Sequence, residues 1–239
     1  MGFTNTGLVA HAKKALNEKW FYGWGTYGQL ATAALIESNI RQYPENAAWK
    51  TYMTVAVGKT RLCDCYGLVK SYLWWTSDGA NPKYNNAQDR NTAGAYNAAK
   101  EKGTLSNMPE IPGIILYMQG HVGVYIGNGE FIELTGGGVG ARKGTIKNGV
   151  VTSGSKFTHW FKDTFITYEA PKQNEIKTVD EAVKVLAIVK LKNGQALMNS
   201  PQYWADCAKK MSADEKINIE YLGQLIINFA NYFKYSELS

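Results

Sequence analysis

One cysteine, one histidine and one glutamate in this chain could together carry out nucleophilic catalysis. Cys65 follows Asp64 at the start of a helix that we predict over residues 66–77. A thiol at the N-terminal end of a helix meets the positive end of the helix dipole, so we expect a lowered pKa and a reactive thiolate. Such a nucleophile needs a base within hydrogen-bond reach. The best candidate is His121, which opens a predicted strand beside Gly120, where the missing side chain leaves room for the imidazole.

The hydrophobic pattern around His121 predicts how a hairpin pairs. Strands are predicted at 121–127 and 130–134, and the Asn-Gly pair between them is typical of a hairpin turn. A two-residue loop would pair Val124 with Glu133 and place the carboxylate on the apolar face. A loop one residue longer, or a bulge at the glycine, pairs Val124 with Ile132 and keeps the apolar side chains together. The sequence favours this second register, which gathers four side chains on the other face: His121, Tyr125, Phe131 and Glu133.

This register makes His121 and Glu133 diagonal neighbours on adjacent strands, within reach of each other. A carboxylate beside an imidazole orients the ring and stabilises its charged form, so the pattern favours a set of nucleophile, base and orienting residue. A solvated strand carboxylate remains the alternative for Glu133. Cys63 is the rival nucleophile, but its spacing from Gly67 fits less well, and we expect it to be buried.

The remaining histidines and cysteine are predicted to be structural. His11 lies in the first predicted helix, and Cys207 lies within a later one. His159 lies next to a tryptophan and could alternatively line the cleft. The aromatic residues in the segment 20–27 are predicted to belong partly to the core, although clefts for peptides and glycans also favour such side chains.

Composition excludes several classes of protein. The chain has 239 residues, of which 45% are hydrophobic, with 24 Gly and 6 Pro, so it is not a disordered or collagen-like chain. Lys plus Arg number 26 against 20 Asp plus Glu, a net charge of +6 that suits anionic polymers in general and gives little indication of nucleic acid. Three cysteines form neither a disulfide framework nor a zinc site, and no metal or organic cofactor is implied.

We expect no membrane span and no signal peptide. No apolar stretch approaches the ~20 residues that a spanning helix needs. The first 20 residues contain neither an apolar core segment nor a small-residue cleavage site. We therefore expect the protein to be made in the cytoplasm.

The predicted elements indicate an α+β fold. Helices come first, and from residue 112 the hydrophobic period changes to that of strands. Helices followed by antiparallel strands are typical of the α+β class. The predicted helices span residues 5–19, 30–40, 66–77 and 93–102, and the predicted strands span 112–118, 121–127, 130–134 and 164–168.

The sequence predicts two domains. The first covers residues 1–170, and a polar linker that begins with a proline follows at 171–177. Residues 178–239 are predicted to form three helices, because patterns typical of helix starts occur at Thr178, Ser200 and Ser212.

Two segments resemble those of a known family of cell-wall cysteine peptidases, the NlpC/P60 family. DCYGLVKSY (64–72) is similar to its D-C-S-G-L/F-V segment, and GHVGVYIGNGEFIEL (120–134) is similar to its G-H-V-G-I-Y-I-G-N-G segment. Tyr22 falls where the family has a tyrosine beside the nucleophile. GTYGQ (25–29) and MPEIPG (108–113) resemble a Gram-positive and phage-lysin branch, and the last 60 residues or so more weakly resemble helical tails of wall hydrolases.

The resemblance implies a papain-like NlpC/P60 fold with Cys65 as nucleophile, His121 as base and Glu133 as the orienting residue. It also implies that the oxyanion or the substrate is bound by Tyr22, Asp64 and Gly120. This chain departs from the family pattern at Tyr66, where serine is common, and at Glu133, where many members have His, Asn or Gln. Asp64 could also simply cap the helix that follows.

The implied function is hydrolysis of peptidoglycan, as an endolysin or an autolysin that acts on the wall after release. The enzyme would cut stem peptides next to D-glutamyl residues. An N-acetylmuramoyl-L-alanine amidase with the same triad, an acyl transferase, and a degenerate protein that only binds the wall remain alternatives. Peptidoglycan is the expected partner, and the net positive charge would also favour anionic wall polymers. For the C-terminal helices, wall targeting and self-association both remain open.

Overall fold

The computed structural model describes residues 2–76, 81–169, 203 and 206. The chain divides into two units, Met1–Pro171 and Lys172–Ser239. Except for Tyr203 and Asp206, which are both helical, the predicted linker and three-helix domain lie outside the described residues. The description below therefore concerns the first unit.

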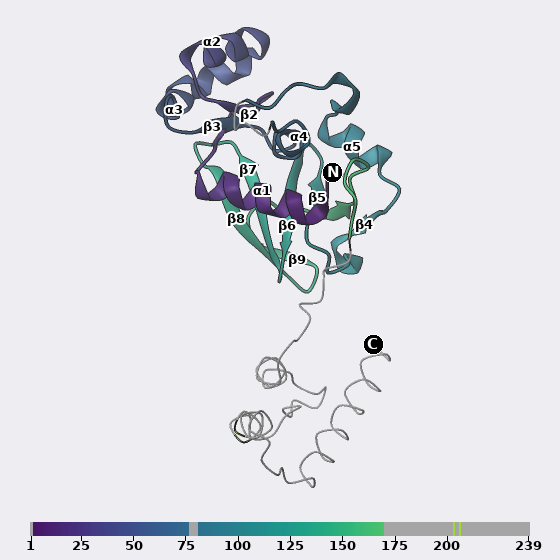
Figure 1. Cartoon of the computed structure of the whole chain (residues 1–239). Helices are drawn as coiled ribbons and strands as arrows, with labels where there is room; N and C mark the ends of the chain where they lie inside the picture. Colours follow the sequence, from purple (N-terminus) through teal and green to yellow (C-terminus); the bar gives the residue numbers. More distant parts are fainter. Residues whose placement is uncertain (1, 77–80, 170–202, 204–205, 207–239) are drawn as a thin grey trace. The chain divides into compact units, whose positions relative to one another are not determined.

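A seven-stranded antiparallel sheet forms the centre of this unit (Figure 1). Its strands follow the order β4-β10-β5-β6-β7-β8-β9. From β5 to β9, each strand therefore forms a hairpin with the next strand in the sequence. With the helices that precede it, this sheet confirms the predicted α+β class. The strands are β4 (Lys102–Thr104), β5 (Ile115–Met118), β6 (His121–Gly127), β7 (Glu130–Thr135), β8 (Gly140–Lys147), β9 (Val150–Ser153) and β10 (His159–Phe161).

Helices cover one face of the sheet. α1 (Asn5–Asn17) crosses β6, β7 and β8, and it begins at Thr4, whose hydroxyl accepts the Gly7 N–H at 3.1 Å. α4 (Gly67–Leu73) packs against α1. Apolar side chains of both helices and of the sheet form one core, which includes Leu8, Ala12, Leu68, Val69, Val122, Val124, Ile132 and Leu134.

The predicted register of the hairpin is confirmed, and it places a second core on the opposite face of the sheet. Val124 pairs with Ile132, and the ladder shifts between Tyr125 and Gly127, which is the bulge that the apolar pattern required. Tyr125 and Phe131 therefore point away from the helices. They pack in the second core together with Ile114, Leu116, Phe157 and Trp160.

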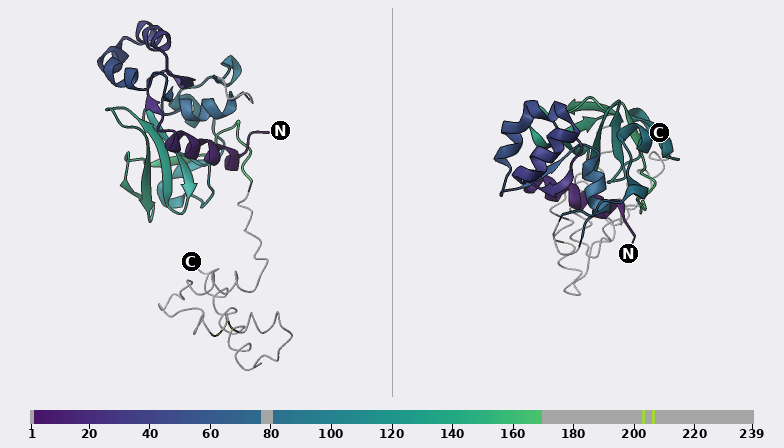
Figure 2. Two further views of the ribbon diagram at one scale, coloured as in Figure 1. Left: turned by 60° about the vertical axis from the view of Figure 1, so that its left-hand side comes forward. Right: turned by 90° about the horizontal axis from the view of Figure 1, so that it is seen from above.

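A helical segment between two short strands forms one edge of the unit. It contains α2 (Ala33–Gln42), η1 (Pro44–Trp49) and α3 (Lys50–Val55), which lie together in Figures 1 and 2. Ile36 and Met53 bury its inner face against Leu62. The small sheet beside it has the order β1-β3-β2 and consists of β1 (Phe21–Tyr22), β2 (Tyr27–Leu30) and β3 (Arg61–Cys63).

Three predicted elements are wrong. The helix predicted at 66–77 is shorter, since α4 spans Gly67–Leu73. The helix predicted at 93–102 is shorter, since α5 spans Thr92–Ala98, and the next residues turn into β4, where Gly103 pairs with Trp160. The strand predicted at 164–168 is instead a turn, in which the Asp163 carboxylate accepts the Phe165 N–H and only Thr167 bridges to Thr4. The last strand of the sheet comes earlier, at β10. A short one-turn helix, η2 (Asn86–Gln88), and another, η3 (Leu105–Asn107), complete the elements.

Within the described residues, no helix combines the length and the apolar character that crossing a membrane requires.

Candidate active site

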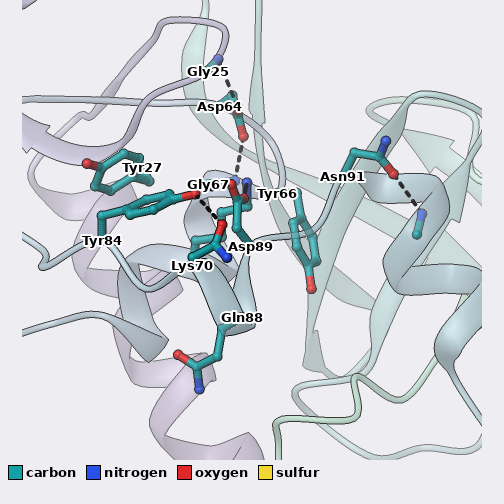
Figure 3. A network of polar contacts seen from close by, with 12 residues as sticks. Gly25, Tyr27, Asp64, Tyr66, Gly67, Lys70, Tyr84, Gln88, Asp89 and Asn91 are labelled. Carbon is teal, nitrogen blue, oxygen red and sulfur yellow. Dashed lines mark hydrogen bonds and ion pairs between the residues drawn. The ribbon is translucent and has the colours of Figure 1, made fainter.

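Cys65 lies in a tight turn between β3 and α4. Asp64 holds this turn, because its two carboxylate oxygens accept the N–H groups of Gly67 and Gly25, the second at 2.9 Å (Figure 3). Gly67 is required here, since a Cβ on it would lie 2.2 Å from the Thr26 carbonyl oxygen. The predicted capping role of Asp64 is confirmed, and the cap sets the position of the cysteine that follows.

The Cys65 side chain packs against the start of β6. Its Sγ lies 4.0 Å from the Gly120 carbonyl oxygen, and the Val122 N–H also faces it, so the sulfur contacts the backbone on both sides of His121. Only 7% of Cys65 is exposed. Among the described residues, no hydrogen bond joins the sulfur to the imidazole.

The expected lowering of the thiol pKa is wrong for this structure. Burial first, and the adjacent Asp64 carboxylate second, raise the pKa of Cys65 to about 12, although the N–H groups of Val122 and Tyr66 act in the opposite direction. α4 begins at Gly67, two residues after the cysteine, and its short dipole does not outweigh desolvation. The thiol is therefore protonated at neutral pH.

His121 and Glu133 form the pair that the register predicts. His121 Nε2 lies 2.6 Å from Glu133 Oε2, and the imidazole stacks on the Phe157 ring at 5.4 Å between centroids. Glu133 is 0% exposed, so the alternative of a solvated strand carboxylate is wrong. Phe157 on one side and the carboxylate at one end fix the plane of the ring.

Glu133 is an ionised carboxylate despite its burial. Burial alone would raise its pKa, but hydrogen bonds from His121 and from Ser155 outweigh this effect and lower the pKa to about 2. An ionised carboxylate only accepts hydrogen bonds, so Nε2 of His121 carries the proton that it shares with Glu133. The other ring nitrogen, Nδ1, is then the one that can accept a proton.

Three residues that support this pair were not predicted from the sequence. Arg142 Nε donates to Glu133 Oε1 at 2.8 Å, and the Ser155 N–H donates to the same oxygen at 3.0 Å. The third is Phe157. Arg142 could have been found, because it lies directly opposite Glu133 in the β7–β8 hairpin. Ser155 and Phe157 follow the last hairpin in an irregular segment, where the sequence carries no periodic signal.

The other predicted site residues lie close to Cys65. Tyr22 pairs with Cys63 across β1 and β3, and burial together with the neighbouring Cys65 raises the pKa of its phenol. Gly120 has φ +79°, a conformation that favours glycine, and it presents its carbonyl to the Cys65 sulfur. The structure therefore brings Tyr22, Asp64 and Gly120 together around Cys65. Cys63, the rival nucleophile, is 0% exposed and belongs to the core.

A cleft of about 860 Å³ opens beside Cys65. One wall is the segment from Tyr84 to Asp89, which is fastened to α4: Lys70 pairs with Asp89, and the Tyr84 hydroxyl donates to Asp89 at 3.0 Å (Figure 3). The remaining lining is mostly aromatic and polar and includes Tyr22, Trp24, Tyr27, Tyr43, Trp74, Arg90, Asn91 and Gln119.

The described residues contain no group of three or more histidine, cysteine, aspartate or glutamate side chains that could hold a metal ion.

Residues 50–155 match the model of the NlpC/P60 family. The chain carries an NlpC/P60 domain. The matched range contains Cys65, His121, Glu133 and Arg142, whereas α1 and Tyr22 precede it. This match confirms the predicted NlpC/P60 fold.

Two solved structures are similar in part. The P60 domain of an antigen from M. avium subspecies paratuberculosis is 18% identical, with 69% of this chain and 98% of that chain covered and a TM-score of 0.35. The peptidoglycan hydrolase RipB from Mycobacterium tuberculosis is 16% identical, with 69% and 67% covered and a TM-score of 0.35. No curated protein is significantly similar in sequence.

The departure from the family pattern after the nucleophile has a structural role in this NlpC/P60 domain. The hydroxyl of Tyr66 donates to Asp163 Oδ2 at 2.6 Å, and only 2% of Tyr66 is exposed. Asp163 is itself buried and also holds the turn that replaces the predicted last strand. Tyr66 thus joins the nucleophile turn to the end of the domain.

Proposed function

We propose that this NlpC/P60 chain is a peptidoglycan hydrolase that cleaves stem peptides as a cysteine endopeptidase. The observation that carries the proposal is the 2.6 Å contact between His121 and Glu133, beside a cysteine whose sulfur packs against the backbone on both sides of that histidine. A nucleophile, a base and an orienting carboxylate are the parts that acyl transfer requires, and here the base and the carboxylate lie on adjacent strands of one sheet.

The proposed reaction begins with a neutral thiol. Because the pKa of Cys65 is about 12, we infer that the proton moves to His121 Nδ1 as the sulfur attacks the peptide carbonyl, so that no stable thiolate is needed beforehand. Glu133 stabilises the imidazolium that forms. The Cys65 N–H and the Tyr22 hydroxyl are the candidate donors to the oxyanion.

The imidazolium then protonates the leaving amine, the C–N bond breaks, and an acyl-enzyme remains on Cys65. Water attacks this thioester, gives one proton back through His121 to the sulfur, and releases the new carboxyl terminus. Cleavage next to a D-glutamyl residue is the specificity that we propose for this site.

The test is digestion of purified Gram-positive peptidoglycan by the wild type, Cys65→Ala and Cys63→Ala, with mass spectrometry of the fragments and labelling of new amino termini. Cys63→Ala is the matched control, since Cys63 lies two residues away but is buried in the core. We expect a new amino terminus within the stem peptide for the wild type and Cys63→Ala, and none for Cys65→Ala.

Other products would change the assignment. A new terminus at L-Ala with free glycan would make the protein an amidase, and a product joined to an added amine would make it a transferase. If the wild type releases no fragment but still sediments with the wall, the protein binds peptidoglycan without cleaving it, and the proposal is wrong.

We also propose that the enzyme acts on the wall after its release from the cytoplasm, as an endolysin does. Support comes from the resemblance of residues 25–29 and 108–113 to the phage-lysin branch and from the net charge of +6. Added protein should then lower the turbidity of Gram-positive cells, while Cys65→Ala should not. Cleavage of purified wall without lysis of cells would contradict this role but not the hydrolase.

A further inference from the structure

Two aromatic side chains, Trp24 and Tyr43, stand at the edge of the cleft that contains Cys65. Their ring centroids lie 5.4 Å apart, with an angle of 36° between the ring planes. Trp24 is 47% exposed, although large apolar side chains are usually covered. An exposed indole at the edge of a cleft is a candidate contact for a ligand.

The fold holds Trp24 in place through its backbone. Asn39 and Asn46 each donate a side-chain N–H to the Trp24 carbonyl at 2.9 Å, and the Trp24 N–H donates to Asn46 Oδ1 at 3.3 Å. Both asparagines are buried, at 5% and 2% exposure. Buried amides are costly unless their hydrogen bonds are satisfied, and here the two side chains bond to the Trp24 backbone and to each other, with Asn46 Nδ2 donating to Asn39 Oδ1 at 2.6 Å. The backbone of Trp24 is therefore held in place, while about half of the residue remains exposed.

This pair of rings is connected to the nucleophile by a short path. The Tyr43 ring packs on Gly25, where a Cβ would lie 2.2 Å from Tyr43 Cε2. Gly25 in turn donates its N–H to Asp64, the residue before Cys65 (Figure 3). A ligand on the two rings would thus lie at a fixed position relative to the attacking sulfur, which is what productive orientation requires.

We propose that Trp24 and Tyr43 form a sugar subsite, which binds a pyranose ring of the glycan strand that bears the stem peptide. This inference rests on the proposed function and specifies its substrate as stem peptide still attached to glycan. Stem peptides consist of small and charged residues and carry no ring that could stack on an indole. A pyranose ring presents a row of C–H groups that fit the electron-rich face of an aromatic ring. The Gln42 side chain, which also lines the cleft and donates to the Tyr43 hydroxyl at 3.3 Å, adds polar groups suited to sugar hydroxyls.

The test compares two substrates that differ only in the sugar: N-acetylglucosaminyl-N-acetylmuramoyl tetrapeptide and the same tetrapeptide without the disaccharide. The ratio of kcat/KM for the two substrates is measured in the wild type, Trp24→Ala and Trp49→Ala. Trp49 is the matched control, because it is exposed to a similar extent, at 43%, and does not line the cleft. We expect the wild type and Trp49→Ala to favour the sugar-linked substrate equally. In Trp24→Ala the ratio of kcat/KM should fall about tenfold, which is the contribution expected of one stacked pair of rings.

Equal losses on both substrates in Trp24→Ala, or no preference in the wild type, would overturn the subsite. Binding of the same two ligands to full-length Cys65→Ala, with and without Trp24→Ala, is measured by calorimetry to keep this test separate from catalysis. A preference for the sugar-linked ligand that disappears with Trp24→Ala supports the subsite even if the wild type cleaves nothing, in which case only the proposed function fails. If the wild type cleaves the substrate but no binding preference for the sugar-linked ligand is found, the subsite is wrong and the proposed function stands.

Discussion

Glu133 and Arg142 face each other directly across β7 and β8, and Arg142 Nε donates to Glu133 Oε1 at 2.8 Å. The other oxygen of the same carboxylate contacts His121 Nε2 at 2.6 Å. The carboxylate thus lies between a permanent cation and the candidate base. Because a guanidinium does not lose its proton in proteins, it favours the ionised form of Glu133 at every working pH.

Arg142→Gln should therefore change the pH dependence of the reaction as well as its rate. Without the cation, the pKa of Glu133 rises, so that the carboxyl is protonated at a higher pH. A protonated carboxyl is uncharged, so it accepts a weaker hydrogen bond from His121 Nε2 and does not stabilise the imidazolium. We expect the acidic limb of the pH–rate profile to move upward, so that kcat/KM falls most on that limb, by about tenfold. The loss should be smallest near neutral pH, where a carboxyl with a wild-type pKa of about 2 stays ionised.

Two variants control this experiment. Arg142→Lys retains the charge and should keep the acidic limb near its wild-type position. Lys143→Gln removes a neighbouring cation of β8 that pairs with Glu130, outside the site, and should leave the profile unchanged. A loss of equal size at every pH in Arg142→Gln would show that Arg142 only supports the fold.

The chemistry of Cys65 itself can be measured without a substrate. With a pKa of about 12, the thiol should be alkylated by iodoacetamide at a rate that rises about tenfold per pH unit up to pH ~11, since only the thiolate reacts. In Cys63→Ala, trypsin releases residues 62–70 with Cys65 as their only cysteine, so mass spectrometry gives its rate directly. A rate that levels off below pH 8 would instead indicate a stable ion pair with His121 in the resting protein.

The hairpin that carries the candidate base and carboxylate could be predicted from the sequence, because burial on one face leaves only one acceptable register. Alternation of apolar residues decides which side chains share a face, and Glu133 can avoid the helix-covered core only if the turn contains a bulge. The pairing of His121 with Glu133 follows from that register alone.

Other features of the site depend on contacts between distant segments, which the sequence does not display. The pKa of Cys65 is set by burial against β6, more than 50 residues away, and this outweighs the local dipole of α4. Ser155 reaches Glu133 from an irregular segment. The end of α5 was predicted too late because residues 99–102 are compatible with a helix, and only the pairing of β4 with β10 decides against it.

Tyr22→Phe tests the proposed oxyanion contact. If the phenol donates to the oxyanion and to little else, its removal should lower kcat by about 10- to 100-fold and leave KM within about twofold. Tyr117→Phe is the control, because Tyr117 stacks on Tyr96 at 4.2 Å and does not line the cleft. A raised KM with unchanged kcat would mean that Tyr22 binds the substrate in its ground state, and no change in either would mean that the phenol only packs.

His11 should make the domain less stable as the pH falls below neutral. The imidazole is buried, and its Nε2 lies 2.7 Å from Ser71 Oγ. Burial is the largest effect that lowers its pKa, to about 4, and the charges of Lys14 and, to a smaller extent, Arg61 act in the same direction. The charge of Glu18 acts in the opposite direction. The unfolded chain binds this proton near pH 6.5, whereas the folded chain does so only near pH 4, so stability is present above pH 6.5 and is lost between these values. The loss should amount to roughly 3 kcal/mol.

Urea unfolding followed by tryptophan fluorescence at several pH values from 7 to 4 measures this loss. Asp64, whose pKa is raised by burial, and Glu133, whose pKa is lowered, also titrate toward the acidic end, so the informative quantity is the difference between variants. His11→Gln should be less stable than the wild type at pH 7 but should lose less free energy of unfolding on acidification. His159→Gln, which changes a half-exposed histidine, should keep the wild-type slope. Parallel slopes for the wild type and His11→Gln would show that His11 takes up its proton in the folded domain as readily as in the unfolded chain.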